Sequence, residues 1–403
     1  MVSSVVKPLS VIHTLGFPID FNGNITRVLG EAVHVARLGI DVEIIVSDKV
    51  PVNFFGQAIR SGVRIYCCSV LIPWREVGWR INNVFPLLLK ILKVVKNKPN
   101  SILHVAAPSP VTKPLTASEI GRRLKIPVVL DLHDPWSSDP FSLNPILILQ
   151  TQIMRHVINN ADFIIVPYKA LLKLVRSINR SKPVAIIPNA VDSNLFRPIA
   201  RNTFLAKKLG LNEDAVVVAF SGHVTKFKGL NTLVHSAQII VQKYKNVRFL
   251  VIGDGPFMRE IVAFTERLGL SNVFRFVGFV PQELVIEYLS LADICVAPYE
   301  PMAFFKVSLP ETPLKVVEYM AMGKPVIMSK ISNENVIAWS GGGLLVTPGD
   351  VSELASSVIN LVEDEELRKN FGEKGRKYVE ENLSWEKHAE RLVEIYQSLN
   401  TRS

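Results

Sequence analysis

Residues 215–234 read AVVVAFSGHVTKFKGLNTLV, and this stretch contains the pattern that decides the fold. Its first part, 215–222, is Val-rich and apolar throughout, which is typical of a parallel strand covered by helices on both faces. A polar, basic loop follows, and a helix is expected to begin near Lys228 and Gly229. The apolar stripe of that helix comprises Leu230, Leu233, Val234, Ala237 and Val241. Strand, loop and helix in this order predict one unit of a doubly wound parallel sheet.

The same alternation runs along the whole chain. In the first half, short Val- and Ile-rich runs predict strands at 10–15, 42–47, 101–106, 127–133, 162–167 and 184–189. In the second half, strands are expected at 215–222, 247–253, 273–279, 292–298 and 325–330. Between the first two strands, an amphipathic helix with a C-terminal stop is indicated by Val28, Ala32, Val35, Leu38 and Gly39.

The run VDSNLFRP, 191–198, marks a linker between two such halves. The predicted fold class is therefore α/β, with two doubly wound Rossmann-like domains. Ligands of these sheets bind at the carboxyl ends of the strands, so two facing sheets are expected to form a central cleft that holds the site.

Composition excludes several classes of protein. The chain has 403 residues, 48% of them hydrophobic and 20% charged, which argues against long disorder. A membrane-spanning helix needs roughly 18 unbroken apolar residues, and the longest uncharged stretches are shorter and polar. The first residues are better interpreted as a buried strand than as a signal peptide. Three cysteines, two of them adjacent, cannot form a disulfide framework, so a reduced, cytoplasmic-type protein is expected.

The charge is concentrated in one half of the chain. Residues 1–195 carry 22 Lys and Arg against 12 Asp and Glu, a net +10, whereas residues 196–403 carry 24 of each. The first half is therefore expected to face an anionic partner. Residues 74–100 combine basic side chains with a dense apolar set, which suits either a helix in an anionic membrane interface or a core helix with a solvated basic face. No interleaved aromatic and basic strand motif is present, so nucleic acid is not predicted as a partner.

The strongest local signal for a site is ETPLKVVEYMAMGKPV, 311–326. Thr312 is expected to cap a helix, with Pro313 at its first position. An anion at that helix start would meet free N–H groups, the positive end of the helix dipole and the charge of Lys315. Glu318, one turn further along, is suited to accept hydrogen bonds from ribose hydroxyls. The pattern predicts a site for a diphosphate and a ribose, and the alternative is an ordinary capped helix.

Two loops and one strand end add candidate residues. Lys226 and Lys228 would flank a phosphate, unless they are simply solvated. Gly23 and Asn24 precede another helix start suited to close approach of an anion. His133 ends the strand 127–133, where Asp131 and Asp134 are candidates to orient or charge it.

Other motifs are missing. There is no Gly-x-x-x-x-Gly-Lys-Ser/Thr loop, and GDGPFM, 253–258, has Met258 where a dinucleotide fingerprint needs Gly, which argues against hydride chemistry. No His or Cys cluster has zinc spacing, so neither a metal nor a cofactor is predicted.

Taken together, several segments resemble the GT-B glycosyltransferases of family 4, a large family of retaining hexosyltransferases. In chain order they are FNGNITRV, VVLDLHDPW, IIPNAVDSNLFRP, SGHVTKFKG, VIGDGP, FVGFV and PLKVVEYMAMGKPV. The segment 384–400 is similar to the family's terminal helix, which crosses back onto the first domain. The resemblance implies an acceptor-binding domain at 1–195, a nucleotide-sugar-binding domain at 196–383 and that terminal helix at 384–403.

The resemblance also implies residue roles. Glu318 would hold the ribose of the donor and Lys228 its diphosphate, while His133 would contact the transferred sugar and the phosphates; these are the expected catalytic residues. The remaining expected donor-binding residues are Gly23, Asn24, His223, Lys226, Gly253, Phe279, Glu311, Pro313, Leu314 and Lys315.

Three departures from the family pattern bear on these roles. His223 replaces an Arg, which makes one phosphate contact weaker or pH-dependent, and Asn24 replaces a second Gly. Glu311 precedes Glu318 by seven residues instead of eight, so its sugar-reading role and the identity of the donor are less well defined.

The implied reaction transfers a hexose from a nucleoside diphosphate sugar, such as a UDP sugar, to an acceptor hydroxyl with retention. A lipid-linked or surface-glycan acceptor of cell envelope biosynthesis fits the basic first half, with the protein in the cytoplasm or peripheral on the membrane. The alternatives are a sugar synthase with a soluble acceptor and a non-catalytic binding protein on a degenerate GT-B fold.

Overall fold

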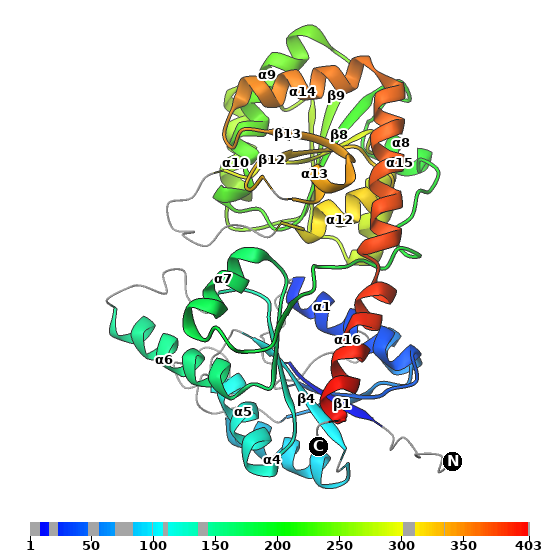
Figure 1. The fold of residues 1–403 in the computed structure, drawn as a ribbon. Helices are drawn as coiled ribbons and strands as arrows, with labels where there is room; N and C mark the ends of the chain where they lie inside the picture. Colours follow the sequence, from blue (N-terminus) through cyan, green and yellow to red (C-terminus); the bar gives the residue numbers. More distant parts are fainter. Residues whose placement is uncertain are drawn as a thin grey trace. The chain divides into compact units, whose positions relative to one another are not determined.

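The computed structural model describes residues 9–15, 23–46, 56–68, 84–98, 100–107, 112–135, 144–300, 311–333 and 335–401. The chain forms two compact units (Figure 1). The first contains the described residues up to Asn189 together with those from Trp385 onward, and the second contains those from Ala190 to Ser384.

The first unit is built on a parallel sheet. Its strands are β1 (Ser10–Leu15), β2 (Asp41–Val46), β3 (Arg64–Cys67), β4 (Ser101–Ala107), β5 (Val128–Leu132), β6 (Phe163–Val166) and β7 (Val184–Ile186). They lie in the order β3-β2-β1-β4-β5-β6-β7. The strand order therefore reverses between β1 and β4, the position at which doubly wound sheets bind ligands.

Helices cover both faces of this sheet. One face packs against α1 (Gly23–Arg37), α2 (Gly56–Arg60) and α16 (Trp385–Asn400). The other packs against α4 (Val84–Lys96), α5 (Thr112–Leu124), α6 (Pro145–Asn160) and α7 (Lys169–Ile178). In α1 the side chains of Val28, Ala32 and Val35 are fully buried as expected, whereas Leu38 is 50% exposed because it lies beyond the last turn.

The second unit repeats the design. Its strands are β8 (Val216–Ser221), β9 (Val247–Ile252), β10 (Phe274–Gly278), β11 (Ile294–Ala297), β12 (Val326–Ser329) and β13 (Gly343–Val346), all parallel. Their order is β10-β9-β8-β11-β12-β13, with the reversal between β8 and β11. On one face lie α9 (Leu230–Lys243), α10 (Met258–Arg267) and α14 (Val351–Glu363). On the other lie α8 (Thr203–Lys208), α11 (Gln282–Ser290), α12 (Leu314–Ala321), α13 (Val336–Ser340) and α15 (Glu365–Asn382).

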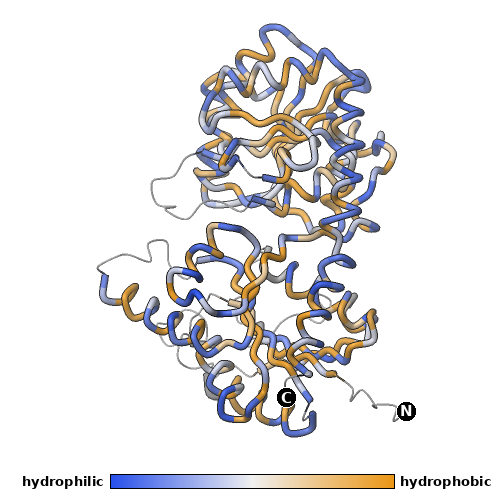
Figure 2. Tube along the Cα trace, in the orientation of Figure 1, coloured by the Kyte–Doolittle hydropathy of each residue, from blue (hydrophilic) through white to orange (hydrophobic). Residues whose placement is uncertain are grey.

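The predicted fold class is confirmed. Each of the expected strands is present, and Figure 2 shows strands of both sheets largely in the colour of hydrophobic residues. The sequence analysis missed β3 and β13, and both are edge strands. The side chains of β3 are partly or fully exposed, and β13 has only one buried residue, Val346, so neither has the continuous apolar run of a central strand.

Two further observations concern possible contact of the protein with a membrane. Among the described helices, none combines the length and the apolar character that crossing a bilayer requires. Helix α4 occupies the second part of the basic segment 74–100; the first part, with Arg75 and Arg80, lies outside the described residues. Its apolar stripe of Leu87, Ile91 and Val94 is buried in the first unit's core.

Candidate active site

In the second unit, α12 is fixed to the carboxyl end of β8. The backbone N–H of Ser221, the last residue of β8, donates to Tyr319 Oη at 2.6 Å, and the Tyr319 hydroxyl donates back to the Ser221 carbonyl at 3.3 Å. Since Tyr319 lies in α12, the helix that follows β11, this contact brings α12 to the end of β8. The start of α12 therefore lies at the strand-order reversal, as expected for a ligand site.

The start of α12 differs from the sequence prediction by one residue. The helix begins at Leu314, and Pro313 is the N-cap with extended dihedrals (φ −61°, ψ 133°), so the assignment of Thr312 as cap and Pro313 as first helical residue was wrong. The Pro313 carbonyl accepts from Val316 N at 2.9 Å and from Val317 N at 3.2 Å. Because a helix has no acceptor for its first amides, those of Leu314 and Lys315 are available to an anion.

Lys315 places a buried ammonium group beside the end of β8. Its Nζ lies 3.6 Å from the centroid of the Phe220 ring and has no hydrogen-bond partner among the described residues. Burial lowers the pKa of Lys315 well below its ordinary value, nearby Lys228 lowers it further, and Glu318 acts in the opposite direction. A Cβ at Gly222 would lie 3.0 Å from this Nζ, so glycine makes room for the ammonium group. The arrangement is suited to receive a negatively charged ligand.

Lys228 is held by a tight turn. It ends a short 3₁₀ turn, Lys226–Lys228, and Gly229 follows with φ +74°. A Cβ at Gly229 would lie 1.5 Å from the Pro298 carbonyl oxygen, so no other residue fits this conformation and approach. The Lys228 ammonium lies over the rings of Phe227 and Tyr299, at 4.6 and 5.0 Å from their centroids. Its electrostatic effect on Lys315 indicates that the two cations lie in one region.

The other predicted residues of the second unit lie in different surroundings. Gly253 adjoins Gly222, since a Cβ there would lie 2.1 Å from the Gly222 carbonyl oxygen. Glu311 is 9% exposed, and its carbonyl accepts from Val336 N at 3.0 Å, which ties it to α13. The side chains of His223, Lys226 and Phe279 are exposed. The structure thus brings together Lys228, Lys315 and Glu318. The roles of His223, Lys226 and Phe279 stay predictions.

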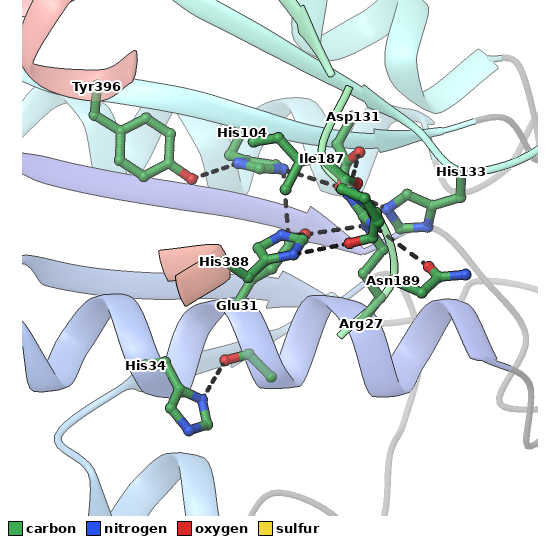
Figure 3. A network of polar contacts seen from close by, with 12 residues as sticks. Arg27, Glu31, His34, His104, Asp131, His133, Ile187, Asn189, His388 and Tyr396 are labelled. Carbon is green, nitrogen blue, oxygen red and sulfur yellow. Dashed lines mark hydrogen bonds and ion pairs between the residues drawn. The ribbon is translucent and has the colours of Figure 1, made fainter. Parts of the chain in front are cut away.

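In the first unit, His133 lies directly after β5, and its side chain is buried at the edge of a polar network (Figure 3). Its Nε2 lies 2.8 Å from Asp131 Oδ2, and its backbone N–H donates to the Ala107 carbonyl at 3.0 Å. Of the two carboxylates predicted to orient it, Asp131 makes the contact, while Asp134 is exposed. Gly23 begins α1 and Asn24 follows it; the side chain of Asn24 is outside the described part of the chain.

The network extends to residues that the sequence analysis did not identify. Arg27 Nε and Nη2 donate to the two oxygens of Asp131 at 3.0 and 3.2 Å. Glu31 lies one helical turn after Arg27 and contacts it at 3.1 Å. His104 Nδ1 lies 2.6 Å from Tyr396 Oη. The members come from α1, β4, β5 and α16, so only the spacing of Arg27 and Glu31 within an apolar helix stripe signalled a buried ion pair.

The two carboxyl groups of this network, Asp131 and Glu31, have pKa values shifted in opposite directions. Burial opposes ionisation of Asp131, but the charge of Arg27, together with His133, holds its pKa well below the ordinary value. Burial, and then Asp131, raises the pKa of Glu31 to about 7, although Arg27 acts in the opposite direction. The network therefore contains one firmly ionised carboxylate and one carboxyl group that titrates near neutrality.

Three buried side chains of the first unit, His13, Glu31 and His104, have possible metal-ligand atoms within 4.8 Å of one another. The His13 and His104 rings stack with centroids 4.4 Å apart and planes 22° apart. Ring lone pairs lie in the ring planes, so stacked rings do not point at one ion as tetrahedral ligands do. Arg27 beside Glu31 also disfavours a cation there. The geometry suits two stacked imidazoles better, and the absence of a metal stays a prediction.

Comparison with known proteins places both units in one family. A family model described as Glycosyltransferase Family 4 matches residues 22–195, and one described as Glycosyl transferases group 1 matches residues 202–378. N-acetyl-alpha-D-glucosaminyl L-malate synthase of Bacillus anthracis is 28% identical over 317 residues, 77% of this chain and 78% of that protein. D-inositol 3-phosphate glycosyltransferase of Corynebacterium urealyticum is 28% identical over 261 residues, 61% of this chain and 59% of that protein.

Solved structures share the fold at lower identity. HepE from Anabaena, in complex with UDP, superposes with a TM-score of 0.74 at 16% identity and covers 97% of this chain and 99% of its own. Sucrose-phosphate synthase from Thermosynechococcus elongatus gives a TM-score of 0.74 at 19% identity, with 98% of this chain and 100% of its own covered. With both family models matched in chain order and the two-sheet architecture shared, the chain belongs to the GT-B glycosyltransferases of family 4, the group 1 type.

Proposed function

We propose that the protein transfers a hexose from a nucleoside diphosphate sugar to an acceptor hydroxyl with retention at the anomeric carbon. The observation that supports this proposal best is the buried ammonium of Lys315, which has no hydrogen-bond partner among residues that the structure describes and lies near Lys228 at the start of α12. Related folds solved with UDP and with UDP-glucose favour UDP as the nucleotide.

In the proposed mechanism, the second unit stabilises the leaving group. Departure of the nucleoside diphosphate builds negative charge on the phosphate oxygens. The ammonium groups of Lys228 and Lys315 and the first amides of α12 would stabilise this charge in a preformed arrangement. Glu318 would accept hydrogen bonds from the ribose.

Retention is proposed to occur by front-face displacement. A double displacement needs a carboxylate that can attack the sugar, and the buried carboxylates near His133 do not suit that role. Both oxygens of Asp131 accept hydrogen bonds from Arg27, and Glu31 is fully buried beside the same guanidinium group. The acceptor hydroxyl would instead attack from the side of the leaving phosphate, whose oxygen takes up the hydroxyl proton. His133 would contact the transferred sugar.

Nucleotide binding tests the proposal. Thermal unfolding is measured with UDP, GDP and ADP and with their common sugar conjugates. A ligand at about 100 times its dissociation constant adds roughly 2.7 kcal/mol to the stability of the protein. We expect a shift with one nucleotide, lost in Lys315→Met and Glu318→Ala.

The matched control is Lys245→Met, because Lys245 is exposed and lies just before β9, at the amino end of the sheet. It should bind the nucleotide like the wild type. If no nucleotide shifts the transition, a degenerate binding protein is favoured. If Lys315→Met binds the nucleotide as well as Lys245→Met does, the proposed donor site is wrong.

For the acceptor, we propose a lipid-linked or surface-glycan substrate reached at an anionic membrane surface. The supporting observation is a mixed apolar and basic face of the first unit, on α4 and α6, each of which packs against α5. Its exposed apolar side chains are Leu89, Leu92, Ile146, Ile148 and Leu149. Its exposed basic side chains include Lys93, Lys96 and Arg155. Exposed apolar groups beside cations suit an interface with anionic lipid.

Vesicle flotation tests this part of the proposal. The protein should float with vesicles that contain an anionic phospholipid and not with neutral ones, and the double variant Ile146→Ser, Leu149→Ser should lose this binding. Phe204→Ser is the matched control, because Phe204 is 79% exposed but lies in the second unit. Equal binding to neutral and anionic vesicles would contradict the role of an anionic surface. Binding to neither would favour a soluble acceptor.

A further inference from the structure

The His133 ring has one nitrogen engaged and one without a partner. Nε2 lies 2.8 Å from Asp131 Oδ2, a hydrogen-bond distance to a carboxylate that can only accept. Nδ1 is buried and has no hydrogen-bond partner within the described part of the chain. A buried polar atom left without a partner is costly unless a ligand or water satisfies it, so Nδ1 is the atom that a ligand can engage.

Asp131 is held as a carboxylate in a fixed orientation by Arg27. Two parallel N–H groups of the guanidinium donate to the two oxygens, at 3.0 Å to Oδ2 and 3.2 Å to Oδ1. A bidentate pair of this kind fixes the plane of the carboxylate as well as its charge. Because Oδ2 is shared between Arg27 and His133, the imidazole is oriented by the pair and not by Asp131 alone.

Arg27 in turn is fixed on every side. Its Nη1 donates to Asn189 Oδ1 and to the Ile187 carbonyl, both at 3.3 Å, and its Nε lies 3.1 Å from Glu31. Glu31 is held from α16, where His388 Nε2 lies 2.9 Å from its Oε1 (Figure 3). The side chain of Arg27 is 3% exposed. These contacts hold the Arg27 guanidinium in one orientation, which suits a positioning role.

We propose that Arg27 and Asp131 are positioning residues that keep a proton on His133 Nε2 and present Nδ1 to the ligand. When Nδ1 carries no proton it accepts a hydrogen bond, which a sugar hydroxyl can donate and an ionised phosphate oxygen cannot. The identity of that ligand rests on the proposed function, whereas the tautomer does not.

The tautomer is measured directly by nitrogen NMR of the full-length protein labelled with ¹⁵N-histidine, at alkaline pH and without ligand. His133→Gln identifies the signals of His133. We expect Nε2 to carry the proton in the wild type, and Asp131→Asn and Arg27→Met to give mixed or reversed tautomers. Arg64→Met is the matched control, because Arg64 also pairs with two carboxylates of the first unit, Asp41 and Glu43, and should leave the His133 signals unchanged.

Turnover gives the second readout. Asp131→Asn should lower kcat at least about 100-fold, as loss of an orienting carboxylate does elsewhere. The affinity for free UDP, which the second unit is proposed to bind, should stay within a factor of about two. Asp131→Asn is nearly isosteric, so it serves if Arg27→Met does not fold.

A wild-type His133 with the proton on Nδ1 overturns the inference, whatever the activity. So do unchanged tautomer and kcat in both variants. An Nε2–H tautomer that both variants disturb, in a protein that turns over no nucleotide sugar, would support the positioning role while refuting the proposed function.

Discussion

Glu31 is fully buried, and its surroundings raise its pKa to about 7, first through burial and then through Asp131. Unfolded glutamate titrates near 4.5, so between these two values the folded chain keeps a proton that the unfolded chain has lost. Stability contributed by Glu31 therefore falls as the pH rises through this window, by at most on the order of 3 kcal/mol.

We expect Glu31→Gln, which cannot ionise, to gain stability relative to the wild type as the pH rises from 4.5 to 7. Taking the difference between the two proteins removes the contribution of His13, whose lowered pKa acts in the opposite direction. The midpoint of urea unfolding at a series of pH values measures it. Glu390→Gln, at an exposed carboxylate on α16, should show no such trend. A constant difference between Glu31→Gln and wild type would contradict the prediction.

Single residues also show how far sequence reasoning reaches. Lys315 and Glu318 were identifiable because they lie on one short helix, where spacing along the chain fixes proximity in space. Arg27 and Asp131 are 104 positions apart in the sequence, and only the strand order places α1 beside the end of β5. Long-range pairs of this kind depend on topology that composition and periodicity do not encode.

At the level of elements, the turn between β8 and α9 depends on one glycine. Gly229 has φ +74°, and a Cβ there would lie 1.5 Å from the Pro298 carbonyl oxygen. Gly269 has nearly the same φ, +68°, with nothing within 4 Å of a built Cβ. The two glycines therefore carry similar backbone strain when substituted and differ in the clash alone.

Gly269→Ala is expected to cost about 1 kcal/mol, the usual penalty for a left-handed alanine. Gly229→Ala is expected to cost several times more and to abolish nucleotide binding, because the turn that holds Lys228 must move. Calorimetric unfolding and nucleotide titration measure both effects. Equal destabilisation by the two substitutions would show that the Pro298 contact is unimportant.

Most of the strands that the sequence predicted correctly are buried on both faces of their sheet. Central strands such as β8 and β9 are apolar on both faces, so a continuous apolar run identified them. The edge strands β3 and β13 lack that run, and the N-cap of α12 was misplaced by one residue because Thr and Pro are each favoured at adjacent positions of a helix start.

At the scale of the whole molecule, α16 completes the core of the first unit. Its buried Ala389, Leu392, Tyr396 and Leu399 belong to the same apolar cluster as α1 and β2. Gly30 of α1 lies so close to Trp385 that a Cβ would come within 2.3 Å of the ring. The first unit therefore depends on residues that follow the second unit in the sequence.

We expect a variant ending at Ser384 to lose the thermal transition of the first unit, because α16 no longer covers one face of its sheet. The second unit, which ends at Ser384, should keep a transition of its own. Differential scanning calorimetry separates the two. Tyr396→Ala is the milder variant and should lower only the first transition, by about 3–5 kcal/mol of stability as for other large buried side chains. An unchanged first transition in the truncated protein would contradict this account.

The return of α16 to the first unit has a consequence for biosynthesis. A ribosome makes the sheet of the first unit early, yet the helix that seals one of its faces is translated only after the whole second unit. During that interval the nascent chain displays the apolar side of α1, and Glu31 lacks its contact with His388. The part made first is thus the last to be finished, and premature termination or slow translation late in the message would leave it open to chaperones and proteases.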